Sequence, residues 1–287
     1  MKTILLPTDF SPTAKHAADF AFSLAQIIEA KLVFLNVIQY VPDTMYNVTE
    51  PSSDLYEIAE EKAEISLERF KENALIRFQG DTELYPDGDI AFFPEIETKV
   101  VCGNISNTIL EIAEELNVDF IVMGMADEKN FLDKIFGSNS LRIAQNANCP
   151  VWIIPQETNI STIKKIMYAS DLGGNEVEFI QKTIDIAKII GAKVSAVNIA
   201  GELEPNIFPS KQVILQINKA LGGNAIHFKN FHSDDVVKGI ETYLETNHAD
   251  ALVVAQEHKN WLERLLIKSV ISRLTYNATI PVLVLQK

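Results

Sequence analysis

Residues 119–140 combine glycines, a polar stretch and a helix start in an order that could hold a phosphate. Their sequence, DFIVMGMADEKNFLDKIFGSNS, has an apolar run that ends at Gly124 and a polar stretch that leads to Gly137 and Ser138. Glycines let backbone N–H groups approach a ligand, and a helix that follows directs its positive N-terminal end at an anion. A turn followed by an ordinary helix cap would give the same pattern.

The second half of the chain repeats this segment without its glycines. There DALVVAQEHKNWLERLLIKSVI places Ala255 at the position of Gly124, and Lys268, followed by Ser269, at that of Gly137. One repeat is therefore expected to bind an anion through its loop, and the other is not. Lys268 beside Ser269 fits either a site for a different anion or a solvated lysine at a helix start.

Most of the chain is duplicated, which predicts two domains. Residues 2–38 and 164–200 both follow the order strand, acidic turn, helix, strand. The matched pairs include Asp9 with Asp171 and Asn36 with Asn198. A short polar, turn-forming stretch at 155–163 interrupts two apolar runs. We therefore expect domains at 1–157 and 158–287, each close to the usual domain size, that pack together.

Apolar runs alternate with helical patterns along both repeats. The expected strands are 3–6, 31–38, 97–102, 119–124 and 150–154, then 165–169, 193–199, 225–230, 250–255 and 281–285. The expected helices of the first repeat are one that begins with Ser11 as its cap and Pro12 as its first residue, and others near 54–75, 106–117 and 138–147. Solidly apolar strands between helices imply an α/β fold with a parallel sheet, whose ligands lie beyond the carboxyl ends of the strands. Asp9, Val37 and Gly124 all lie at such ends.

Composition and charge narrow the classes of partner. Hydrophobic residues make up 47% of the chain and charged residues 22%, with no run of eighteen apolar residues, so a soluble, cytoplasmic protein is expected. The net charge of −14 argues against binding to nucleic acid or to an anionic membrane. Cys102 and Cys149 form no CxxC pair and are expected to be buried, reduced thiols.

Several segments together resemble the universal stress protein family in its tandem, two-domain form. ILLPTDFS at 4–11 is similar to the family's first strand and acidic turn, LNV at 35–37 to the end of its second strand, and CPVWIIP at 149–155 to its last strand. The phosphate loop of nucleotide-binding members reads Gly, two residues, Gly, nine residues, Gly, then Ser or Thr. In this chain Gly124, Asp127, Gly137 and Ser138 occupy those four places.

The resemblance implies two Rossmann-like domains of the adenine nucleotide alpha hydrolase-like type, each with a five-stranded parallel sheet and helices on both faces. It also implies a role in survival under stress, with ATP bound in some members and not in others. By position, Asp9 would contact the ribose or adenine region and the Val37 backbone would read the adenine edge. The implied cofactor-binding set is Pro7, Thr8, Asp9, Val37, Met123, Gly124, Asp127, Gly137, Ser138, Asn139 and Ser140. In single-domain members the last strand forms the edge through which two chains dimerise. Residues 150–154 are therefore expected to pair with 281–285, which would make an internal pseudo-dimer. The resemblance leaves open whether two such chains also form a homodimer.

Asp127 departs from the family pattern, because it puts a carboxylate where the second loop glycine would be. At 4 Å and an effective dielectric constant near 20, a phosphate charge would be repelled by roughly 4 kcal/mol before screening. The carboxylate could instead turn to solvent or recruit Mg²⁺ as a bridge to the phosphates, and Lys129 or Lys134 could offset it. In the second repeat Ala255, His258 and Lys268 replace all three loop glycines, so nucleotide binding is not expected there.

Two functions follow from these patterns. The first is a sensor in which ATP occupies the first domain and an unidentified protein partner reads that state. The second is a nucleotide-free scaffold that makes its partner contacts through residues 40–98. An ATP hydrolase is a weaker third candidate, because no base or water-positioning residue can be named. Asp9 taken alone is explained equally well as a helix cap.

Overall fold

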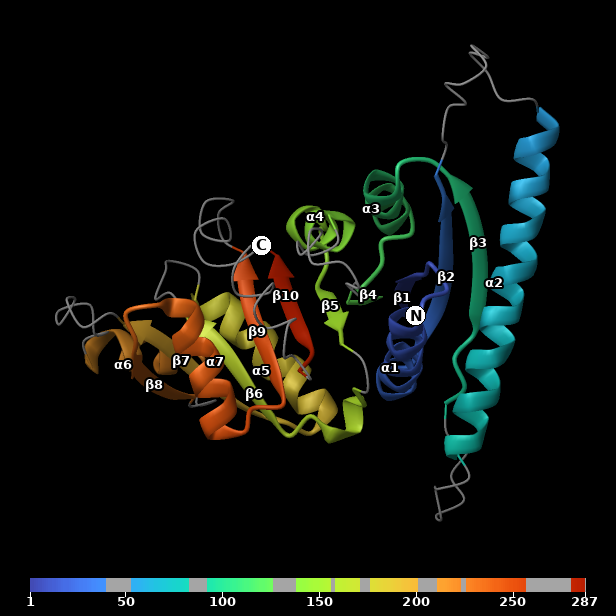
Figure 1. Cartoon of the computed structure of the whole chain (residues 1–287). Coiled ribbons are helices and arrows are strands. Elements are labelled where there is room, and N and C mark those ends of the chain that lie inside the picture. Colours follow the sequence, from blue (N-terminus) through green and yellow to red (C-terminus); the bar gives the residue numbers. More distant parts are fainter. Residues whose placement is uncertain are drawn as a thin grey trace, which may run out of the picture. The chain divides into compact units, whose positions relative to one another are not determined.

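The computed structural model describes residues 1–39, 53–82, 92–125, 138–155, 158–170, 176–200, 211–222, 226–256 and 280–286 (Figure 1). The chain divides into two compact units. Among the described residues, the first unit ends at residue 155 and the second begins at residue 158. The same alternation of strand and helix runs through both units.

The sheet of the first unit consists of five parallel strands in the order β3-β2-β1-β4-β5. Their bounds are β1 Lys2–Pro7, β2 Ala30–Ile38, β3 Ile96–Cys102, β4 Phe120–Gly124 and β5 Val151–Ile154. The chain builds outward from β1 to β3, then returns to the other side of β1 and continues with β4 and β5. The order therefore reverses between β1 and β4, which is where doubly wound sheets form their ligand crevice.

The helices of the first unit cover both faces of this sheet. They are α1 Pro12–Ile28, α2 Ser53–Thr82, α3 Ile105–Glu115 and α4 Ser138–Asn146. Helices α1 and α2 pack on each other, and so do α3 and α4. Because parallel crossovers are right-handed, the reversal of direction after β3 puts the second pair on the opposite face from the first.

Helix α1 begins as the sequence predicts. Ser11 has extended backbone angles, and its side chain accepts a hydrogen bond from the Ala14 N–H at 3.2 Å, while Pro12 occupies the first helical position. Small buried side chains, including Ala17 and Ala18, let this helix lie close to the sheet. The N-cap at Ser11 is thus confirmed, and the alternative that Asp9 caps the helix is wrong.

Helix α2 is longer than the periodicity indicates. The helix is expected near residues 54–75, but the structure continues it to Thr82. The cause is tertiary packing: the Phe78 ring stacks on Phe22 with centroids 5.0 Å apart and meets Phe93 at 6.0 Å. Such contacts stabilise helical turns that local propensity alone would not.

The second unit repeats the topology of the first, with strands in the order β8-β7-β6-β9-β10. Its strands are β6 Lys165–Ser170, β7 Lys193–Ala200, β8 His227–His232, β9 Ala251–Gln256 and β10 Val282–Gln286. Its helices are α5 Glu176–Ile190, α6 Lys211–Ala220 and α7 Val236–Asn247, preceded by the short 3₁₀ helix η1 Ile160–Thr162. The expected α/β class with parallel Rossmann-like sheets is confirmed. Within the described part of the chain, no helix combines the length and the hydropathy needed to cross a lipid bilayer.

Each unit anchors the start of its first strand in the same way. In the first unit the Asp119 carboxylate accepts a hydrogen bond from the Thr3 N–H at 2.8 Å, and the Asp119 N–H donates to the Thr3 carbonyl oxygen at 2.8 Å. In the second unit Asp250 makes the equivalent two bonds with Lys165, both also at 2.8 Å. The internal repeat therefore extends to individual side-chain contacts.

Candidate functional site

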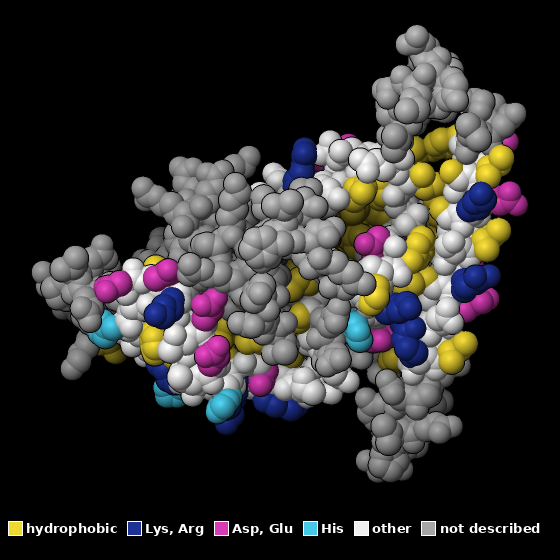
Figure 2. All heavy atoms as spheres, viewed as in Figure 1, with side chains coloured by type: hydrophobic (Ala, Val, Ile, Leu, Met, Phe, Trp, Pro, Cys, Tyr) yellow, Lys and Arg dark blue, Asp and Glu magenta, His cyan; other side chains and the backbone are white. Residues whose placement is uncertain are grey.

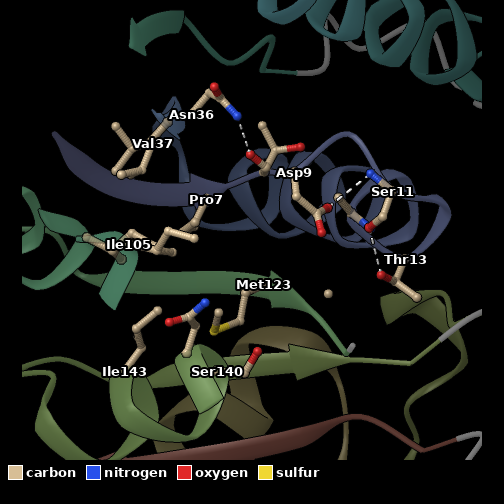
Figure 3. A pocket seen from close by; sticks show the side chains of 16 residues that line it. Pro7, Asp9, Ser11, Thr13, Asn36, Val37, Ile105, Met123, Ser140 and Ile143 are labelled. Carbon is tan, nitrogen blue, oxygen red and sulfur yellow. Dashed lines mark hydrogen bonds between the residues drawn. The ribbon is translucent and has the colours of Figure 1, made fainter. Parts of the chain in front are cut away.

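A cavity of about 350 Å³ opens at the carboxyl ends of β1, β2 and β4, in the first unit (Figure 3). It lies where the strand order reverses, which is the place where open α/β sheets bind ligands. Its volume falls in the range of small-molecule sites. The described residues that line it come from the strand ends and from helices α1, α3 and α4.

One part of the cavity wall is apolar. Figure 3 shows Pro7 and Met123 at the strand ends, between Val37 on one side and Ile143 on the other. Ile105 of α3 completes this surface. Aliphatic walls on several sides form a slot that suits a flat, weakly polar ring.

The polar lining is concentrated in the turn after β1 and at the start of α4. Thr8, Asp9 and Ser11 belong to the turn, and Asn139 and Ser140 to the first turn of the helix. The first N–H groups of a helix have no partner within the helix, so this end of α4 offers hydrogen-bond donors and a positive dipole end. The cavity thus pairs an apolar slot with groups able to bind hydroxyls and an anion.

Hydrogen bonds to strand β2 hold the turn after β1 in place. The Thr8 N–H donates to the Leu35 carbonyl oxygen at 2.9 Å, and the Asn36 side-chain amide donates to the Thr8 carbonyl oxygen at 2.8 Å (Figure 3). The Thr8 hydroxyl oxygen also accepts from the Phe10 N–H at 3.0 Å, and Phe10 adopts a left-handed φ of 65°. The backbone of Thr8 is therefore tied to the neighbouring strand through both its N–H and its carbonyl.

Asp9 closes a second small turn while remaining at the mouth of the cavity. Its Oδ1 accepts a hydrogen bond from the Ser11 N–H at 3.0 Å, and its side chain is exposed. Within the described part of the chain, Oδ2 makes no hydrogen bond. Asp9 can therefore orient the turn with one oxygen and accept a hydroxyl of a ligand with the other.

Gly124 has a packing role that the sequence pattern does not reveal. A Cβ atom added there would lie 2.7 Å from both the carbonyl carbon and the oxygen of Thr13, and 2.9 Å from the Ala14 nitrogen. These are backbone atoms, which cannot move aside cheaply. The glycine therefore lets the end of β4 approach the first turn of α1, whatever it does for a ligand. The matched position in the second unit, Ala255, carries a Cβ.

Asn139 is oriented from the neighbouring helix. The Ser106 hydroxyl of α3 donates to Asn139 Oδ1 at 2.6 Å, and Ser106 is only 2% exposed. With its oxygen so engaged, the Asn139 amide group has its two N–H donors left for the cavity. Ser140 is also buried, at 7% exposed, and lines the cavity beside it.

The structure brings most of the expected cofactor-binding residues together. Those that line the cavity are Pro7, Thr8, Asp9, Val37, Met123, Gly124, Asn139 and Ser140. Ser138 begins helix α4. Asp127 and Gly137 lie outside the described residues, as do Asp171, His258 and Lys268 of the second repeat. Ser106 had no signal in the sequence, whereas Asn36 was marked by its match with Asn198 and by its place in the LNV motif, without a role being assigned to it.

Two groups with raised pKa values lie away from the cavity. A hydrogen bond with Cys102, together with burial, raises the pKa of Tyr56 to about 12. Burial and the nearby Asp119 charge raise the pKa of Cys149 to about 12. Neither group lines the cavity, so they give no reason to assign acid–base chemistry to it. Among the residues that the structure describes, no group of three or more His, Cys, Asp or Glu side chains could hold a metal ion.

A doubly wound α/β domain with a ligand-sized cavity at its switch point defines the class of this protein. The model of the Universal stress protein family matches residues 1–155 and 214–286 of the sequence. The chain therefore belongs to the universal stress protein family, and the resemblance seen in the sequence is confirmed.

Individual relatives within the family have low sequence identity to this chain. Universal stress protein MJ0531 of Methanocaldococcus jannaschii is 28% identical over 155 residues, which cover 53% of this chain and 81% of that protein. Universal stress protein Sll1654 of Synechocystis sp. is 26% identical over 157 residues, covering 54% of this chain and 85% of that protein. The crystal structure of a universal stress protein from Archaeoglobus fulgidus matches with a TM-score of 0.72 at 16% identity, over 99% of this chain and 96% of that one. At this identity the structural match speaks for the fold.

Proposed function

We propose that the first unit binds ATP, and that this cytoplasmic stress-response protein reports the bound state to a protein partner. The observation that carries the proposal is the cavity at the switch point, where an apolar slot and the N-terminal end of α4 face one space. The second unit lacks the loop glycines, so one nucleotide per chain is expected. Family membership supports the stress-related role.

Each part of the cavity has a matching part of the nucleotide. The slot between Val37 and Ile143 would hold the adenine ring, and the free oxygen of Asp9 would accept a ribose hydroxyl. The Asn139 amide, the Ser140 hydroxyl and the first N–H groups of α4 would donate to phosphate oxygens. Most of the attraction for the triphosphate would thus come from dipoles, in keeping with a chain whose net charge is −14.

The proposal includes Mg²⁺ because Asp127 could bind the ion together with the phosphates of ATP. A carboxylate in the phosphate loop repels a bare triphosphate, but it can share a divalent cation with it. Binding would then be strengthened by Mg²⁺ and would be weaker when ATP is offered with a chelator. We assign no catalytic role to any residue. Asp9, the carboxylate among the described lining residues, is engaged in its own turn.

The test is isothermal titration calorimetry of the whole chain with Mg-ATP, Mg-GTP and ATP plus EDTA. Asp9→Asn keeps the Oδ1 acceptor for the Ser11 N–H while it removes the charge that would face a ribose hydroxyl. We expect it to weaken ATP binding about tenfold, which corresponds to one charge-assisted hydrogen bond. Asp171→Asn, the matched change in the second repeat, should leave binding unchanged. Wild-type protein that takes up no nucleotide would overturn the proposal.

A nucleotide-free scaffold remains the second candidate, because helix α2 exposes apolar side chains that the fold does not need. Asp127→Gly separates the two functions. If wild type fails to bind and Asp127→Gly binds, the carboxylate has switched off an inherited site and the scaffold is the function. If both fail to bind, the cavity does not hold ATP at all.

A further inference from the structure

Helix α2 presents three large aliphatic side chains to solvent. Ile58, Ile65 and Ile76 are 47%, 55% and 67% exposed. The helix lies alongside β3 at the edge of its unit (Figure 1), and Figure 2 shows hydrophobic side chains alternating with charged ones along it. Single exposed apolar residues are ordinary on protein surfaces. Three on one helix call for an explanation if they share a face.

The three isoleucines do share a face, with a regular spacing. They belong to the series Ile58, Lys62, Ile65, Arg69, Glu72 and Ile76, which we call the α2 seam. Its members alternate four and three residues apart, and all are exposed. This is the a/d spacing of a coiled coil. The buried positions of the same helix, which include Leu67 and Ala74, lie on the opposite side and pack against the sheet.

We propose that the α2 seam is an interface on which a second copy of this chain docks, with the two α2 helices antiparallel about a two-fold axis near residue 67. In that arrangement Ile58 lies opposite Ile76 of the other copy, and Lys62 lies opposite Glu72. Ile65 lies opposite Arg69, whose aliphatic stem can cover it while the charged end reaches water. Each pairing occurs twice, as a two-fold axis requires.

The charges of the seam select this orientation. A parallel pair in register would place Lys62 against Lys62, Arg69 against Arg69 and Glu72 against Glu72, and each contact would be repulsive. The antiparallel pair replaces two of these contacts with attraction between Lys62 and Glu72. Among the residues that the structure describes, none of these three side chains takes part in an ion pair within its own chain. Their charges are therefore available to another copy.

Two polar side-chain contacts tie helix α2 to the rest of its unit. The Arg77 guanidinium pairs with Asp19 of α1 at 2.9 Å, and the Glu68 carboxylate accepts from the Thr98 hydroxyl of β3 at 2.7 Å. A preorganised surface binds without first being ordered. The seam is nonetheless only about 27 Å long at 1.5 Å per residue, so the interface is small and the dimer depends on protein concentration.

Sedimentation velocity of the full chain, from about 1 to about 500 µM, tests the interface with charge reversals. Lys62→Glu faces Glu72 with a like charge, and Glu72→Lys does the same to Lys62. We expect each to weaken dimerisation at least about tenfold, and the double variant to recover to within about threefold of wild type. Ten residues separate the two positions on one helix, so recovery cannot arise within a single chain.

Matched controls carry the same charge changes away from the seam. Glu64→Lys changes an exposed residue on another face of α2, and Lys219→Glu changes an exposed residue of α6. Both should dimerise as wild type does. A wild-type chain that stays monomeric throughout would overturn the proposal. A dimer that is indifferent to both single reversals, or a double variant that stays as weak as the singles, would also overturn it.

Discussion

The side-chain amide of Asn36 donates a hydrogen bond to the carbonyl oxygen of Thr8 at 2.8 Å. The second unit makes the same bond, from Asn198 to Ser170, at 3.0 Å. Because it occurs in both repeats, including the one without loop glycines, this bond belongs to the fold of the repeat. In the first unit it also fixes the turn that carries Asp9 into the cavity.

Replacing each asparagine by alanine should separate these two roles. Asn36→Ala and Asn198→Ala should each lower the unfolding free energy by about 1 kcal/mol, the usual net value of one hydrogen bond. Only Asn36→Ala should also weaken ATP binding, since it frees the turn at the cavity. Thermal unfolding and calorimetry of both variants provide the check. Equal loss of binding in the two would mean that the effect is global.

Gly124→Ala should destabilise the first unit even without ligand. The added methyl would meet the backbone of Thr13 at 2.7 Å, and overpacking of this kind costs about 1 to 3 kcal/mol. The reverse change in the second repeat, Ala255→Gly, should cost only about 0.5 to 1 kcal/mol, through chain entropy. Denaturant unfolding of the two variants measures both. If Gly124→Ala were as stable as wild type, the close approach of β4 to α1 would be wrong.

Ser106→Ala should weaken nucleotide binding through Asn139. Without the hydroxyl that engages Oδ1, the amide is free to rotate, and we expect affinity to fall about threefold to tenfold. In an Asn139→Ala background the same change should cost nothing, because its target is gone. Calorimetry of the double-mutant cycle decides the matter. Additive losses would show that Ser106 acts by another route.

Cys149 should resist thiol reagents in the native protein. Its pKa of about 12 leaves almost no thiolate at pH 8. Since this pKa is raised on folding, its contribution to stability is full below about pH 8.5 and is lost as the pH rises toward 12. A Cys102→Ser variant isolates the thiol for titration with a chromogenic disulfide. Cys149 is only half-buried, so rapid labelling without denaturant would contradict its raised pKa.

Much of the fold could be predicted from the sequence because most of its strands are solidly apolar and both halves of the chain repeat the same order of strands and helices. The expected strand at 165–169 is observed as Lys165–Ser170, because a buried strand is marked by a run of apolar residues within its own short sequence. The end of α2 could not be predicted, since it depends on Phe78 meeting Phe22, far away in the sequence.

Some residues of the candidate site could likewise be predicted from the sequence, and others could not. Residues in one continuous motif, such as Thr8 and Asp9, could be named from the sequence, and they line the cavity. The bond from Ser106 to Asn139 joins residues of two helices that are 33 positions apart in the sequence, so no local pattern could indicate it. Whether the named residues bind a nucleotide stays a prediction until it is measured.

The reciprocal bonds of Asp119 with Thr3, and of Asp250 with Lys165, lie at the amino ends of their strands. Gly124 and its match Ala255 are a pair at which the loop glycine of the first repeat is replaced in the second. Both lie at the carboxyl ends of their strands, away from these anchors. The hydrogen bonds that anchor each first strand and the positions proposed to decide nucleotide binding thus lie at opposite ends of the strands. Under the proposed function, substitutions at the carboxyl-end edge of the second unit would remove nucleotide binding without unfolding that unit, because its hydrogen-bonded anchor at the amino ends is retained.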